Sequence, residues 1–192
     1  YELDYSSEGI KDFDSKVQEI VGKDAKYLLR YPTVYIVNDK NKEKQFSVYI
    51  GETSDIKKRT IQHLTVDPKS RSDWENLAIS ESSKMYVIGH EHFNKSLTLD
   101  IENKLMLYMS SIENVDAVYN RRTNQQNDYV TAHELDNIFS KVLRGLQKKN
   151  KELFPVEQII RDSAIFKASP FHKLTEEQIR TKDFITLRIM QA

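Results

Sequence analysis

The sequence contains no cysteine, which excludes disulfides, thiolate zinc sites and cysteine nucleophiles. No apolar run approaches the roughly 18 residues that a membrane-spanning helix needs, and no signal-peptide pattern opens the chain. Charge of one sign is not in excess either, since Lys plus Arg and Asp plus Glu both number 29. We therefore expect a cytoplasmic protein without a membrane segment. Its net charge gives no indication of a nucleic-acid partner, because dedicated nucleic-acid binders are usually strongly basic.

The length of 192 residues is enough for one domain of ordinary size with an appendage. Charge is uneven along the chain, although it balances overall. Basic clusters occur at Lys57-Lys58-Arg59, at Arg121-Arg122, and at Lys141, Arg144, Lys148, Lys149 and Lys151. Each cluster alone is explained at least as well by a solvated helix face as by a binding surface.

The spacing of apolar residues divides the chain into alternating helices and strands. The expected helices span residues 12–30, 55–66, 74–79, 96–112 and 131–149, and the expected strands span residues 33–37, 46–51 and 84–88. A polar stretch between the first two strands is suited to a hairpin turn. The pattern predicts an α/β (α+β) fold with a small central antiparallel sheet of three strands flanked by helices.

Three regions are expected in this chain. Residues 1–30 would form an N-terminal helical extension, residues 31–128 the main domain, and residues 129–192 a helical extension or linker. Neither an internal repeat nor a low-complexity tract is visible in the sequence.

Two tyrosine-containing runs lie on the expected hairpin. The first is TVYIV at residues 33–37, and the second is VYIGETSDIKKRTIQHL at residues 48–64, which passes from strand through turn into helix. Together they resemble the two signatures of the GIY-YIG nucleases, with Tyr35 and Tyr49 as the key tyrosines. Thr33 stands where the family has the leading glycine of its first signature. The resemblance covers about half of the chain and implies a metal-dependent DNA endonuclease in residues 31–128.

Arg59 and His63 stand four residues apart on the expected helix and therefore project from the same side. The planar guanidinium matches the oxygens of a phosphate, and an imidazole can accept or donate a proton near neutral pH. Without the surrounding motif, Arg59 would be a surface residue of a basic run and His63 a satisfied histidine at a helix edge. The resemblance implies instead that both belong to the active site.

Glu102 has apolar neighbours on its helix, among them Leu99, Leu105, Met106 and Met109. A carboxylate in that setting needs a partner, because burying it unpaired is costly. A structural salt bridge to a lysine such as Lys104 or Lys58 is one solution. The resemblance implies the other solution, in which Glu102 is the ligand of Mg²⁺ or Mn²⁺, hard ions that need only one or two protein carboxylates.

Asn120 stands where the family has an asparagine that helps to order the site, although a turn asparagine explains it nearly as well. The resemblance assigns roles to the remaining residues. Tyr35 would orient or deprotonate the attacking water, with His63 as an alternative proton acceptor, and Tyr49 and Arg59 would hold the phosphate. The Glu102-bound metal would stabilise the departing 3′ oxygen. The expected catalytic set is Tyr35, Tyr49, Arg59, His63, Glu102 and Asn120, and the expected DNA contacts are Lys57, Lys58, Arg121 and Arg122.

Residues 163–178 look similar to the junction in bacterial proteins that joins such a nuclease to a helicase-like P-loop ATPase. The 192 residues contain no GxxxxGK[ST] loop, so we expect that ATPase beyond Ala192, with the basic series at residues 141–151 as a DNA-tracking surface.

The alternative function is a catalytically silent domain of this type that binds nucleic acid or a protein and regulates an ATPase. Thr33 and the neutral net charge favour this alternative, whereas the joint presence of the six site residues favours the nuclease. A single such domain offers one active site, so we expect it to nick DNA.

Overall fold

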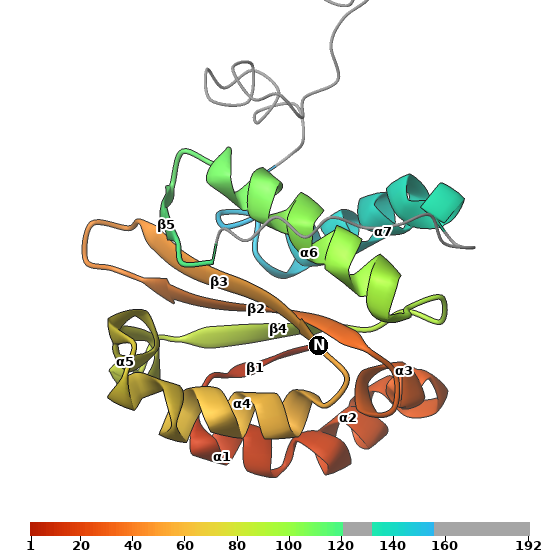
Figure 1. The fold of residues 1–192 in the computed structure, drawn as a ribbon, viewed down its shortest axis with the longest axis horizontal. Coiled ribbons are helices and arrows are strands. Elements are labelled where there is room, and N and C mark those ends of the chain that lie inside the picture. The colour runs from red at the N-terminus through yellow and green to blue at the C-terminus, as the bar shows by residue number, and fades with distance from the viewer. Residues whose placement is uncertain (121–131, 156–192) are drawn as a thin grey trace, which may run out of the picture. The chain divides into compact units, whose positions relative to one another are not determined.

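A computed structural model describes residues 1–120 and 132–155 of the chain. A mixed sheet of five strands lies at its centre (Figure 1). In order across the sheet, the strands are β1 (Glu2–Asp4), β4 (Lys84–Ile88), β2 (Thr33–Lys40), β3 (Phe46–Thr53) and β5 (Val115–Val118). Neighbouring strands are antiparallel except β3 and β5, which are parallel.

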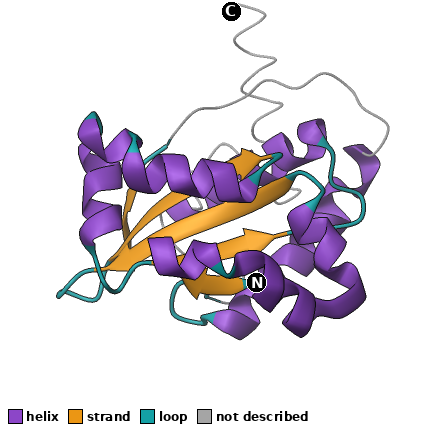
Figure 2. Ribbon diagram, turned by 90° about the horizontal axis from the view of Figure 1, so that it is seen from below, coloured by secondary structure: helices purple, strands orange, loops and turns teal. Residues whose placement is uncertain are grey.

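Helices cover both faces of this sheet (Figure 1). The first face carries α1 (Ser7–Lys11), α2 (Phe13–Val21), α3 (Lys26–Leu29), α4 (Ile56–Thr65) and α5 (Ser72–Ile79), and the second face carries α6 (Lys95–Ser110) and α7 (Leu135–Lys149). Short 3-10 turns occur at Gly22–Ala25, Asp67–Lys69 and Ala132–Glu134. Figure 2 looks onto the first face, where the strands are visible between the helices.

Strand β2 is buried on both faces, which explains its unbroken apolar run. Tyr35 and Val37 belong to the core of the first face, together with residues of α2, α4 and α5 such as Phe13, Ile56 and Trp74. Side chains alternate along a strand, so the intervening residues of β2 point to the second face. That face is covered by α6, whose apolar stripe is fully buried.

The sheet is larger than the sequence predicts. The three expected strands are present as β4, β2 and β3, and they pair antiparallel, but β1 and β5 extend the sheet at its two edges. A small sheet of three strands is therefore not confirmed, whereas an α/β fold with a sheet flanked by helices is. The two edge strands have only three and four residues, too few for an alternating pattern to stand out from loop sequence.

The segment expected as an N-terminal extension, residues 1–30, shares the core of the main domain. Strand β1 pairs with β4, and Tyr5 and Phe13 are buried in the same cluster as Tyr35. The helix expected over residues 12–30 is divided into α2 and α3, because Gly22 has a φ of 65° at the end of α2.

The described part of the expected C-terminal extension, residues 132–155, also packs on the domain. Helix α7 buries Ile138, Leu143 and Leu146, and Phe154 beyond it is fully buried. The described residues form one compact unit. The junction-like segment at residues 163–178 lies outside them. No helix of the described ranges has both the length and the apolar character needed to cross a membrane.

Candidate active site

The hairpin of β2 and β3 brings the two motif tyrosines together. Tyr35 stands opposite Gly51, and Val37 stands opposite Tyr49. The rings of Tyr35 and Tyr49 stack with centroids 6.2 Å apart and planes inclined by 19°. A Cβ at Gly51 would lie 2.5 Å from Cζ of Tyr35 and closer still to its hydroxyl, so the second motif needs glycine because the Tyr35 ring fills the space of a side chain.

Thr33 fits its place without strain. It lies in regular β-strand opposite Thr53, and its hydroxyl donates to the Thr53 carbonyl at 3.4 Å. Among the described residues, positive φ angles occur only at Gly22 and Lys44. The backbone at Thr33 therefore has no need of glycine, and a β-branched residue suits a strand.

Helix α4 begins directly after β3 because Asp55 caps it, with its Oδ1 accepting from the Lys58 N–H at 3.0 Å. This start places Arg59 and His63 one turn apart beside the hairpin. His63 is 1 % exposed, and its Nε2 lies 2.8 Å from the Tyr35 hydroxyl.

A connected set of hydrogen bonds extends from His63. Its Nδ1 lies 2.5 Å from Oδ2 of Asp67, the first residue of the turn after α4. The other Asp67 oxygen accepts from the side-chain amide of Gln62 at 3.2 Å, and Oε1 of Gln62 accepts from the Arg59 guanidinium at 3.1 Å. The Trp74 ring stacks on the imidazole, with centroids 3.6 Å apart and planes inclined by 13°. The imidazole is thus held at both nitrogens and on one face.

Burial keeps the side chains of His63 and Tyr35 uncharged. It lowers the pKa of His63 to about 4, despite the opposing effect of Asp67. It also raises the pKa of Tyr35 well above its ordinary 10, although the Arg59 guanidinium acts in the other direction. At neutral pH the imidazole is therefore neutral and the phenol is protonated.

Glu102 and Asn120 approach β3 from α6 and from the end of β5. The Asn120 amide donates to Oε1 of Glu102 at 3.3 Å and to the Ile50 carbonyl, and its oxygen accepts from the Ile50 N–H at 3.2 Å. Asn120 therefore links Glu102 through hydrogen bonds to the backbone of Ile50, which lies between Tyr49 and Gly51.

The salt bridge considered for Glu102 is not found among the described residues. Lys104 pairs with Asp136 at 2.8 Å instead, and Lys58 is exposed. The hydrogen-bond partner of Glu102 is the amide of Asn120, a neutral group, and the charges of Lys95 and Arg59 only partly offset the effects of burial and of Glu52 on its pKa.

Glu52 is a second carboxylate near Glu102, and the sequence did not single it out. Asn94 caps α6, so that Lys95 and Thr98 in its first turn bind the Glu52 carboxylate, Thr98 at 3.3 Å. Thr98 lies one turn before Glu102 on the same side of α6. Burial, together with the negative charge of Glu52, raises the pKa of Glu102 to about 7.

No hydrogen bond joins these carboxylates to the tyrosine and histidine side chains in the described ranges, but their charges interact. The charge of Arg59 lowers the pKa of Glu102, and the charge of Glu102 raises the pKa values of Tyr35 and Tyr49. The described part of the chain contains no group of three or more His, Asp or Glu side chains placed to hold a metal. Glu102, with Glu52 beside it, is what this site offers to a cation.

The residues expected to contact DNA differ in whether they are paired with an acidic group. Lys57 forms an ion pair with Asp14 at 2.9 Å, whereas Lys58 is exposed. Arg121 and Arg122 lie outside the described residues. Arg71 was not expected at the site, yet its guanidinium lies over the rings of Tyr49 and Trp74, 5.7 and 5.9 Å from their centroids.

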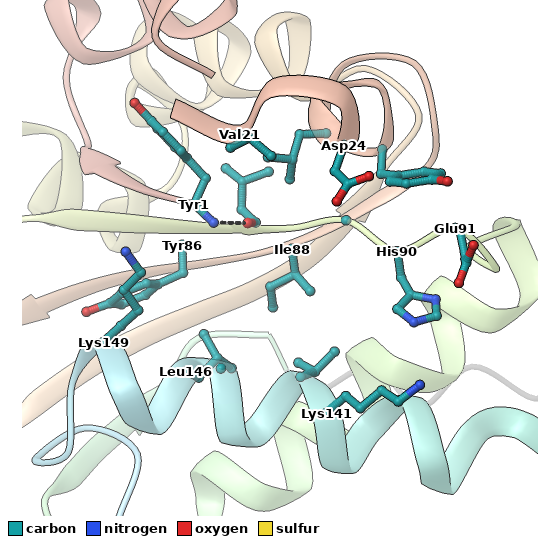
Figure 3. Close-up of a pocket in the computed structure, with 16 residues that line it drawn as sticks. Tyr1, Val21, Asp24, Tyr86, Ile88, His90, Glu91, Lys141, Leu146 and Lys149 are labelled. Carbon is teal, nitrogen blue, oxygen red and sulfur yellow. Dashed lines mark hydrogen bonds between the residues drawn. The ribbon is translucent and has the colours of Figure 1, made fainter. Parts of the chain in front are cut away.

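A cleft of about 530 Å³ lies apart from these residues, beside the end of β4 and α7 (Figure 3). Lys141 and Lys149 of α7 line it together with His90 and the aromatic ring of Tyr86. None of the six residues of the expected catalytic set lines this cleft.

Comparisons of the chain with known protein families, with curated proteins and with solved structures find no match. A functional proposal for this protein therefore depends on the chemistry of the site and on the resemblance of its two motifs to those of a known family.

Substituting Gly51→Ala is expected to lower the free energy of unfolding by about 1–3 kcal/mol, because the new methyl group overlaps the buried Tyr35 ring. Urea denaturation measures this change. The matched control is Gly145→Ala, where a Cβ meets nothing within 4 Å, and which should stabilise α7 by roughly 0.5–1 kcal/mol. Equal effects of the two substitutions would contradict the close packing described for Gly51.

In EDTA, Glu102→Gln is expected to raise the free energy of unfolding at pH 8 by up to about 3 kcal/mol. The pKa of Glu102 is about 7 in the folded protein against its ordinary 4.5, so the folded wild type loses stability as pH rises from about 4.5 to 7. The variant avoids this loss, and its advantage should vanish near pH 4.5.

Urea denaturation across this pH range measures the difference. Glu113→Gln, at an exposed position after α6, is the charge-matched control and should show no such gain. A variant at Glu102 that is no more stable than wild type at pH 8 would show that the carboxylate is not held in an unfavourable charged state.

Proposed function

We propose that this protein is a metal-dependent endonuclease of the GIY-YIG type that hydrolyses phosphodiester bonds of DNA. The observation that carries the proposal is the contact of Tyr35 with His63 at 2.8 Å, beside Tyr49 and Arg59, with the buried carboxylate of Glu102 within electrostatic range. These residues come from β2, β3, α4 and α6, and together they offer a phosphate-binding cation, a proton acceptor and a cation-binding carboxylate.

Arg59 is the group best suited to the scissile phosphate. Its side chain is half-buried, donates to Oε1 of Gln62 at 3.1 Å, and also hydrogen-bonds to the Tyr35 hydroxyl. A guanidinium has five N–H donors, so further donors can bind the non-bridging oxygens. Preorganised donors of this kind typically supply about 3–4 kcal/mol of transition-state stabilisation.

Tyr35 is the group proposed to contact the attacking water. Its side chain is only 1 % exposed, and its hydroxyl hydrogen-bonds to the Arg59 guanidinium. We expect Arg59 to move onto the phosphate when DNA binds and to uncover the hydroxyl. His63 lies behind the phenol, where it can accept a proton but cannot reach solvent.

The carboxylates fit a hard divalent ion. The pKa of Glu102 is raised by burial and by the charge of Glu52, and a cation at Glu102 would relieve both effects. Oxygen ligands suit Mg²⁺ and Mn²⁺, and one or two protein carboxylates are enough when water and phosphate complete the coordination. A bound ion would supply positive charge to stabilise the departing 3′ oxygen.

Helix α7 supports a nucleic-acid substrate. Three cations spaced along one exposed side of it, Lys141, Arg144 and Lys148, have no acidic partner among the described residues. Unpaired cations in a row match the repeating charge of a phosphate backbone.

A catalytically silent domain that binds nucleic acid or a protein is the alternative proposal. The neutral net charge of the chain and the protonated state of Tyr35 favour it. Cleavage assays separate it from the nuclease.

Wild-type protein is expected to nick supercoiled plasmid with Mg²⁺ or Mn²⁺, to be inactive in EDTA, and to lose activity about 100-fold or more in Arg59→Ala. Agarose electrophoresis follows the conversion to open circles. Lys23→Ala, which removes an exposed cation outside the proposed site, is the control and should retain most of the activity. DNA binding by wild type without cleavage under all metal conditions would favour the silent binding domain instead.

Reversing the α7 charges with Lys141→Glu, Arg144→Glu and Lys148→Glu is expected to weaken DNA binding and to flatten its salt dependence. The slope of log K against log salt should fall by about one for each backbone phosphate that the variant no longer neutralises. Fluorescence anisotropy with a labelled duplex measures both quantities.

The control for α7 is the set Lys23→Glu, Lys42→Glu and Lys44→Glu, which changes the net charge equally at exposed positions elsewhere. An equal weakening of binding in the two variants would mean that net charge, and not the α7 surface, sets the affinity.

A further inference from the structure

We propose that Asp67 is a positioning residue that fixes the proton of His63 on Nδ1, so that Nε2 accepts the Tyr35 proton during cleavage. This inference rests on the nuclease function proposed above and adds to it a three-residue proton relay. Its geometric basis is the line of contacts from Asp67 Oδ2 to His63 Nδ1, at 2.5 Å, and from His63 Nε2 to the Tyr35 hydroxyl, at 2.8 Å.

The direction of both hydrogen bonds follows from the group at each end, an acceptor at Asp67 and a donor at Tyr35. An ionised carboxylate can only accept, and hydrogen bonds from His63 and Gln62 keep the pKa of Asp67 low although burial acts to raise it. The Nδ1 of His63 must therefore carry the hydrogen. Because the buried imidazole is neutral, its Nε2 has a free lone pair, and the Tyr35 hydroxyl donates to it.

The surroundings hold the imidazole in this orientation. Trp74 stacks on it at 3.6 Å, and the Tyr49 ring contacts it edge-on at 5.5 Å. A ring flip would break both hydrogen bonds at once. The charged groups that act on the imidazole are Asp67, which favours its protonation, and Arg59 and Arg71, which oppose it.

The orientation of Tyr35 then determines what its oxygen can do. With its hydrogen directed at His63, the phenol oxygen accepts from Arg59 in the free protein, and it can accept a hydrogen bond from water once Arg59 moves onto the phosphate. As the water attacks, it gives one proton to the Tyr35 oxygen, and Tyr35 gives its own proton to Nε2. The imidazolium that forms is stabilised by the charge of Asp67, which is not itself protonated.

The remaining bonds change at phosphorus. The water oxygen forms a bond to phosphorus, and the bond from phosphorus to the 3′ oxygen breaks with its electron pair on that oxygen, which takes a proton from solvent. His63 afterwards returns its proton to solvent through Tyr35. One water is consumed, and the products are a 5′ phosphate and a 3′ hydroxyl.

The test substitutes Asp67→Asn and measures both the tautomer of His63 and the rate of plasmid nicking. The introduced amide can donate to Nδ1, which would place the imidazole hydrogen on Nε2 and reverse the bond to Tyr35. We expect nitrogen-15 NMR to show the Nδ1–H form in wild type and the Nε2–H form in the variant, with nicking reduced about 100-fold or more. The chain has five histidines, so His63→Gln identifies the signal.

Two further variants make the test specific. Asp67→Glu keeps a carboxylate on a longer side chain, and should retain the Nδ1–H form and recover part of the rate. Asp12→Asn removes the same charge at an exposed site that pairs only loosely with Lys16, at 3.9 Å, and should change neither reading.

The NMR measurement separates this inference from the proposed function. An Nε2–H imidazole in wild type, or an Asp67→Asn variant with unchanged tautomer and unchanged nicking, would overturn the role of Asp67 whether or not the protein is a nuclease. If wild type shows the Nδ1–H form but never cleaves DNA, the hydrogen-bond geometry is correct. The proton relay and the nuclease function are then both rejected.

Discussion

The packing of the Tyr35 ring over Gly51 is the constraint on which the rest of the site depends. Strand pairing places the two residues opposite each other, and only glycine leaves room for the ring. The ring in turn fixes the position of its hydroxyl beside His63 of α4, and it stacks on the Tyr49 ring of β3. A side chain at Gly51 would therefore disturb the sheet, the helix contact and the hydrogen bond together.

The ionisable groups of the site are buried in states that differ from those they have in water. Tyr35 stays protonated, His63 stays neutral, and Glu102 has a pKa of about 7. Groups perturbed in this way by burial gather at functional sites more often than elsewhere. A cation bound at Glu102 would further offset the effects that raise its pKa, and a phosphate bound at Arg59 would add a negative charge beside the guanidinium.

The sequence predicted the central elements, because β2, β3 and α6 have strong apolar patterns, and it missed β1 and β5, whose pairing depends on neighbours distant in the chain. Motif spacing was enough to select Tyr35, His63 and Arg59, which the structure brings close together. Asp67 was missed although it stands four residues after His63, a spacing that places both on one side of a helix. The place of Arg71 over Tyr49 comes from the turn before α5 and has no sequence signal.

The most direct test of the account is a crystal structure of the Tyr35→Phe variant with a short DNA duplex and Mn²⁺, with the metal located by its anomalous scattering. The account predicts a manganese peak at the Glu102 carboxylate and a backbone phosphate against the Arg59 guanidinium, with the imidazole of His63 still held by Asp67. DNA bound without a phosphate at Arg59, or manganese located away from Glu102, would contradict it.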